Sequence, residues 1–179
     1  MMRMKDLKLY DIKFSGLKNG NHQLKFHLEP GFFRHFNYDE FEHYNLDILI
    51  DFTKTETLLE FNIHSSGTVQ LNCDVSGEPY NQTIKGDIRF VIKFGESFND
   101  DRDDLIILPY QSHTFNIAQQ IYETVLLNIP QKRIHPDLLS GKMSTENTKY
   151  IINYQDKPET KEIDPRWAAL KKILTDKKQ

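Results

Sequence analysis

Histidine is the residue type in this chain that could most readily bind a metal ion or transfer protons. The chain has a single cysteine, Cys73, and seven histidines: His22, His27, His35, His43, His64, His113 and His135. No two histidines have the HxxxH spacing that places two ligands on one helical face, and Cys73 has no cysteine partner for a zinc site. We therefore expect neither a metal site nor a cofactor.

The acidic run at residues 96–104 is the second place where chemistry could reside. It contains five carboxylates, Glu96, Asp100, Asp101, Asp103 and Asp104, but lacks the glycine and the terminal glutamate of an EF-hand loop. The chain also has no phosphate-binding glycine loop, no GxSxG motif and no HExxH motif. We expect an acidic loop here, no catalytic residue, and a protein that is not an enzyme.

Two basic clusters could bind a partner instead. The first is the segment NIPQKRIHPD at residues 128–137, in which Lys132, Arg133 and His135 follow a predicted helix. Basic groups at this position complement the negative end of the helix dipole, which is a sufficient structural reason for them. The functional alternative is a small patch that contacts phosphate groups.

The second basic cluster is IDPRWAALKKIL at residues 163–174, which holds the only tryptophan. Asp164 and Pro165 are favoured residues for the start of a helix, and the apolar residues share about a third of its surface. A helix this short needs a surface to lie against. Trp167 is a core residue, a partner anchor or a base-stacking residue, with Arg166, Lys171 and Lys172 beside it.

The first half of the chain alternates apolar and polar residues, which is typical of antiparallel strands with one buried face. The alternation covers residues 10–14, 24–28, 46–52, 59–63, 69–75 and 88–94. Turn residues separate these segments at Ser65-Ser66-Gly67, at Ser76-Gly77-Glu78-Pro79 and at Gly86. Six short strands predict a strongly curved, mainly antiparallel sheet, or an open barrel.

A change of period then predicts one long helix at about residues 116–129, with Asn116 at its start and Pro130 ending it. This helix should cover the sheet and give an α+β fold. The aromatic segment between the second and third strands should plug one end of the sheet. In an alternative reading the curved sheet is a cup for a small ligand, and the aromatic segment is its lid: Phe32, Phe33, Phe36, Tyr38 and Phe41.

The 179 residues divide into three predicted parts. Residues 1–135 form a single β-rich α+β domain, residues 136–162 a flexible polar arm, and residues 163–175 a short amphipathic terminal helix. The chain has no apolar run long enough to cross a membrane and no secretory signal, and one cysteine suits a reducing compartment. We expect a cytoplasmic protein with no membrane partner.

The net charge of −3 is unsuited to a protein that coats nucleic acid by electrostatics alone, and we expect no DNA partner. The C-terminal residues, in contrast, carry a net positive charge. From Lys161 to the end, six basic residues stand against three acidic ones. Runs of this kind are usually solvated faces, and the less common alternative is a binding surface.

The order of these segments resembles the YceD family, described as large ribosomal RNA subunit accumulation proteins, in a form typical of the Bacteroidetes. The resemblance covers about residues 65–135 and 163–174, and its most specific pieces are LNIPQKRIHPD and DPRWAALKKIL. The motif residues carried over are Cys73, Asp74, Pro130, His135 and residues 164–170. Many relatives have a second cysteine three positions after the first. Here that position is Ser76, so a metal or redox role for such a pair is not implied.

The resemblance implies a cytoplasmic, non-enzymatic factor that supports accumulation of 23S rRNA and assembly of the large (50S) subunit. Its implied partners are a pre-50S particle, 23S rRNA and large-subunit ribosomal proteins. We expect contact through Lys132, Arg133 and His135, and through the terminal helix with Arg166, Trp167, Lys171 and Lys172. The small-ligand cup remains the alternative hypothesis.

Overall fold

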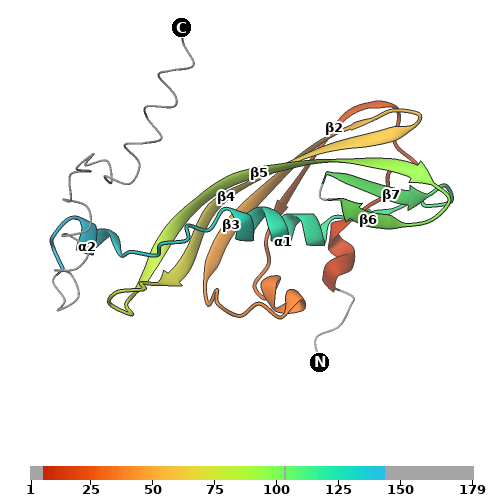
Figure 1. Ribbon diagram of the computed structural model, residues 1–179. Coiled ribbons are helices and arrows are strands. Elements are labelled where there is room, and N and C mark those ends of the chain that lie inside the picture. The colour runs from red at the N-terminus through yellow and green to blue at the C-terminus, as the bar shows by residue number, and fades with distance from the viewer. Residues whose placement is uncertain (1–5, 103, 144–179) are drawn as a thin grey trace, which may run out of the picture. The chain divides into compact units, whose positions relative to one another are not determined.

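The computed structural model describes residues 6–102 and 104–143 of the chain. The described residues up to Pro136 form one compact unit, built on a six-stranded sheet (Figure 1). Its strands, in their order across the sheet, are β2 (Gly20–His27), β3 (Tyr44–Lys54), β4 (Leu58–Asn72), β5 (Pro79–Gly95), β7 (Leu105–Pro109) and β6 (Asn99–Arg102). Strand β7 pairs with β5 in parallel, and the other neighbours are antiparallel. The sheet is therefore mixed.

The predicted alternation of apolar and polar residues is confirmed in the central strands. In β3 the side chains of Leu46, Ile48, Ile50 and Phe52 are buried, and the residues between them are exposed or half-buried. Strand β4 buries its odd-numbered residues from Leu59 to Leu71, Gly67 being half-buried. One face of the sheet thus forms the core, because side chains along a strand alternate between its two faces.

The prediction of a strongly curved sheet or open barrel is wrong: the sheet is open, with β2 and β6 as its edges. The predicted turns at Ser65-Ser66-Gly67 and at Gly86 both lie inside long strands, and Ser65 pairs with Gly86. These glycines serve close packing. A Cβ on Gly67, whose φ is +146°, would overlap the backbone oxygen of Asn45, and one on Gly86 would overlap the side chain of Asn128.

The predicted long helix is shorter than expected. Helix α1 spans Ala118–Leu127, whereas Phe115–Asn116 form strand β8, which pairs with β1 (Asp11–Ile12). Asn116 explains the difference, because its amide nitrogen donates to Leu7 O (2.8 Å) and Asp11 Oδ1 (2.6 Å). Its Oδ1 accepts from the N–H of Ala118 (3.1 Å). The residue that was expected to start the helix therefore belongs to the small sheet, and Ile117 is the N-cap of α1.

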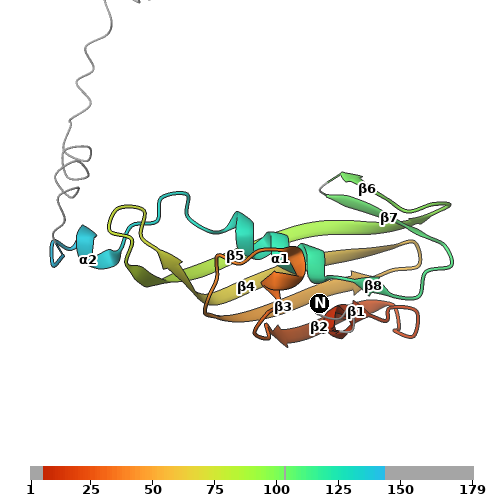
Figure 2. The same cartoon turned by 90° about the horizontal axis from the view of Figure 1, so that it is seen from below.

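Helix α1 packs on β4 and β5 through Ala118, Ile121 and Val125, all buried. The 3-10 helices η1 (Asp6–Tyr10) and η2 (Phe33–Phe36) lie on the same side of the sheet as α1 (Figures 1 and 2). The described fold is mainly β, with one helix of ten residues covering part of one sheet face.

The aromatic segment around η2 fills space between the sheet and α1, and so belongs to the core. Phe33 is 1% exposed, and its ring centroid lies 4.8 Å from that of Phe41 and 4.9 Å from that of Tyr44. Phe36 stacks on Tyr122 of α1 at 4.4 Å. The hollow beside these rings has a volume of about 200 Å³, smaller than is usual for a ligand pocket. These contacts do not support the cup-and-lid alternative.

Residues 136–143 belong to the predicted arm, and Pro136–Leu139 form the short helix α2. The rest of the arm, from residue 144, and the terminal helix predicted at residues 163–175 lie outside the described residues.

Candidate functional site

The segment after α1 is fastened to the turn between β4 and β5. The N–H of Asp74 donates to Arg133 O (2.8 Å), and the N–H of Arg133 donates to Asp74 Oδ2 (2.9 Å). The N–H of His135 donates to Cys73 Sγ (3.3 Å). We call these four residues, Cys73, Asp74, Arg133 and His135, the junction. Three of the motif residues on which the family resemblance rests, Cys73, Asp74 and His135, thus belong to the junction.

The Arg133 guanidinium is engaged within the protein. Its Nη1 lies 2.8 Å from Glu40 Oε2, which also accepts a hydrogen bond from the Tyr38 hydroxyl (2.9 Å). Partial burial acts to lower the pKa of Arg133, but the Glu40 carboxylate outweighs it and raises that pKa. Burial and the hydrogen bond to Glu40 raise the pKa of Tyr38. Arg133 therefore links the junction to the loop after η2.

The other two members of the predicted basic patch lie in different surroundings. Lys132 is exposed, whereas His135 is half-buried, with its ring 5.7 Å from that of Tyr80 in an edge-to-face contact. The structure thus brings the three residues into one segment but gives them different neighbours. That they contact RNA stays a prediction.

Cys73 is buried, as predicted, and its sulfur accepts hydrogen bonds. Burial acts to raise the pKa of the thiol, but donors from Ser76, His135 and Val75 outweigh it and lower that pKa. The Ser76 hydroxyl is one of these donors. Ser76 also accepts a hydrogen bond from the N–H of Glu78 (3.3 Å) and thus supports the turn.

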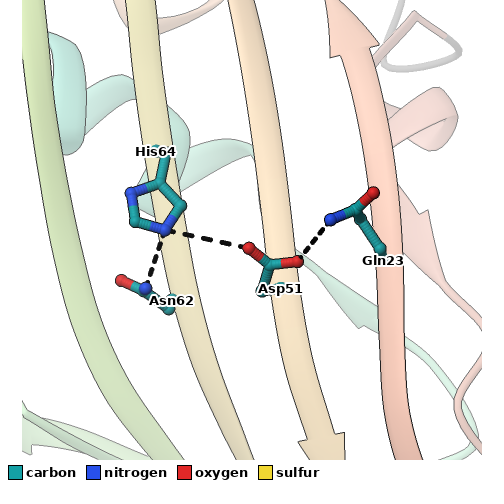
Figure 3. A network of polar contacts seen from close by, with 4 residues as sticks. All are labelled: Gln23, Asp51, Asn62 and His64. Carbon is teal, nitrogen blue, oxygen red and sulfur yellow. Dashed lines mark hydrogen bonds and ion pairs between the residues drawn. The ribbon is translucent and has the colours of Figure 1, made fainter.

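A polar network crosses the open face of the sheet, opposite to α1 (Figure 3). Gln23 Nε2 on β2 donates to Asp51 Oδ1 on β3 (2.8 Å), and Asp51 Oδ2 lies 3.8 Å from His64 Nε2 on β4. The Asn62 amide nitrogen lies 2.7 Å from the same histidine nitrogen. Sequence reasoning missed this network, because the alternation places each residue on the outer face but does not give the register that joins the strands.

The network borders a groove of about 610 Å³ on the same face. Its charged side chains are Asp51, Glu60, Asp104 and Arg89. Asp104 pairs with Arg102 at 3.2 Å. Asn62 Oδ1 is buried and has no hydrogen-bond partner among the described residues. The lining thus includes three carboxylates and one guanidinium, and one of the carboxylates is paired with Arg102.

Within residues 6–102 and 104–143, no group of three or more His, Cys, Asp or Glu side chains is arranged to hold a metal ion. None of the helices in that part of the chain is long and apolar enough to span a membrane. The predicted site residues Arg166, Trp167, Lys171 and Lys172 lie outside it.

The chain matches a known protein family. The family described as "Large ribosomal RNA subunit accumulation protein YceD" matches residues 61–174. No curated protein and no solved structure matches. The matched region includes the junction and the sequence of the predicted terminal helix.

Proposed function

Since the chain belongs to the YceD family, we propose that it is a non-enzymatic factor that supports accumulation of 23S rRNA and assembly of the 50S subunit. The family is named for the accumulation of large ribosomal subunit RNA, and the name implies no catalytic activity. The observation that carries the proposal is the match over residues 61–174, which spans most of the sheet and all the quoted motifs. The factor acts in the cytoplasm on an rRNA–protein assembly intermediate.

The structure supports adhesion through surfaces as the mode of action. The junction residues hydrogen-bond to one another and to the fold, which gives Cys73 and Asp74 a positioning role. The core beside the aromatic segment is filled by its own rings. A factor of this kind acts by binding and release, which a modest net charge of −3 permits.

The proposed contacts are the exposed Lys132 with its neighbours Arg133 and His135, and the terminal segment with Arg166, Trp167, Lys171 and Lys172. Cationic side chains contact phosphates, and an aromatic ring stacks on a base or anchors in a protein pocket.

Depletion of the protein tests the proposed function directly. We expect sucrose-gradient profiles with fewer 50S subunits and less 23S rRNA relative to 16S rRNA, both restored by the wild-type gene. Normal levels of both after complete depletion would refute the proposal.

The variant Trp167→Ala tests the role of the terminal segment. We expect it to reduce co-sedimentation with pre-50S particles while the melting temperature of the purified protein stays close to that of the wild type. A large loss of melting temperature with co-sedimentation intact would instead place Trp167 in the core.

A further inference from the structure

The outer face of the central strands is free of covering elements in the part of the chain that the structure describes. Helices α1, η1 and η2 lie on the opposite side of the sheet (Figures 1 and 2). The groove of about 610 Å³ lies on this outer face and is lined by polar and apolar residues of β2, β3, β4 and β5, and by Asp104. It is a surface on rigid strands that a partner can reach.

The groove presents carboxylates in fixed positions. Gln23 orients Asp51 with a 2.8 Å hydrogen bond, and the two residues are register partners on β2 and β3. Asn62 is the partner of Asp51 on β4, and its amide nitrogen lies 2.7 Å from His64 Nε2. Glu60 is exposed on the same face, two residues away along β4. The groove is therefore lined by two carboxylates, Asp51 and Glu60, on neighbouring strands.

The charges favour a cationic occupant. Asp51 and Glu60 contribute two carboxylates, against the guanidinium of Arg89, while the third carboxylate, that of Asp104, is paired with Arg102. Phosphate groups would be repelled by this set, whereas a guanidinium group donates up to five hydrogen bonds in a geometry that matches carboxylates. An ammonium group is also attracted, but as a point charge without that geometry.

We propose that this groove binds a lysine- or arginine-rich polypeptide segment, with Asp51 and Glu60 as its main charged contacts. The inference deepens the proposed function and rests on it for the source of the segment, which is a basic protein of the assembling large subunit. In this arrangement the groove binds protein, while the contacts to RNA come from the basic segments.

Fluorescence anisotropy with a fluorescein-labelled peptide of alternating arginine and glycine, twelve residues long, tests the inference with the full-length protein. One carboxylate contact to a cation is worth roughly tenfold in affinity. We expect Asp51→Asn and Glu60→Gln each to weaken binding about tenfold. Asn at position 51 keeps an acceptor for Gln23, and Glu60 is exposed, so both variants should fold; their melting curves verify this.

The matched control is Glu78→Gln, which removes the same charge from an exposed position in the β4–β5 turn, outside the groove. We expect it to change the affinity by less than about twofold, because a distant surface charge is screened at 0.15 M salt. An equal loss in Glu78→Gln and Glu60→Gln would show non-specific attraction and overturn the inference.

A labelled uridine oligonucleotide of twelve residues tests whether RNA, instead of a basic peptide, occupies the groove. Stronger binding of this RNA than of the peptide, weakened by Arg89→Gln, would also overturn the inference. So would absence of peptide binding at 0.15 M salt. Neither result changes what the depletion experiment says about ribosome assembly. A normal ribosome profile after depletion, in turn, would not change the measured affinity for the peptide. The two proposals can therefore fail separately.

Discussion

The junction leads to a testable prediction about how the segment after α1 is held. In the variant Asp74→Ala, the N–H of Arg133 loses the carboxylate that accepts its hydrogen bond at 2.9 Å. The bond from the N–H of Asp74 to Arg133 O uses backbone atoms only and can persist. The substitution therefore removes the hydrogen bond to the Asp74 carboxylate and keeps the backbone hydrogen bond beside it.

The exposure of Asp74 determines how much stability we expect the variant to lose. A hydrogen bond to a charged group contributes about 1.5–3 kcal/mol, and because Asp74 is exposed we take the lower end. For a chain of this length, a loss of about 1.5 kcal/mol lowers the melting temperature by about 3–6 °C. The variant Asp74→Asn keeps a neutral acceptor and should lose about half as much. Arg133→Ala breaks a partly exposed ion pair and should cost about 0–1 kcal/mol.

Thermal unfolding followed by circular dichroism measures the stability, and amide hydrogen exchange measures the local effect at Arg133. We expect faster exchange at Arg133 in Asp74→Ala than in the wild type. Glu78→Ala is the control in the same turn, with an expected change below about 0.5 kcal/mol. If Asp74→Ala melts like the wild type and Arg133 exchanges at an unchanged rate, the carboxylate does not hold this segment.

Two further predictions concern the packing of α1 and the buried tyrosines. Gly86→Ala should lower the free energy of unfolding in urea by about 1–3 kcal/mol, because the new methyl group displaces the Asn128 side chain and breaks its 2.8 Å hydrogen bond to a backbone oxygen of α1. The control Gly16→Ala adds its methyl group in open space and should leave the stability unchanged. Equal losses of stability in the two variants would refute this prediction. Burial raises the pKa of Tyr10 to about 12 from an ordinary value of 10, so the folded state keeps a proton that the unfolded state releases between these pH values. The free energy of unfolding should therefore fall as the pH rises from 10 to 12. Urea titrations at pH 8 and pH 11 should show a smaller fall in Tyr10→Phe than in the wild type. The same pH dependence in both proteins would contradict this prediction.

The burial pattern of the sheet could be predicted from the sequence because it depends on side-chain alternation alone. Leu46, Ile48, Ile50 and Phe52 are buried as expected, and so is Cys73. The aromatic segment was expected to plug one end of the sheet, and its rings do pack in the core, with η2 as its short helix.

The lengths of the strands could not be predicted, because glycine has more than one structural use. At Gly67 the absence of a side chain allows the backbone of β3 to approach, and at Gly86 it makes room for Asn128 beyond the end of α1. Both uses depend on residues far away in the sequence. A turn assignment based on neighbouring residues therefore divided β4 and β5 into shorter strands and suggested a barrel.

The candidate sites show the same limit. The sequence placed Arg133 in a basic patch, but its partner Glu40 is 93 positions earlier and only the fold brings them together. The groove depends on the register that aligns Gln23, Asp51 and Asn62 across three strands. Alternation showed that these residues face outwards, and the pairing of strands determined which of them are neighbours.

The continuity of β4 fixes the distance between the two candidate surfaces of the folded unit. Glu60 in the groove and Asn72 beside the junction lie on one strand that pairs with a neighbour on each side. At about 3.3 Å per residue, the strand between them is about 40 Å long. A single partner that contacts both places must reach along this strand, whereas a small compact protein can occupy one of them and leave the other open to a second molecule.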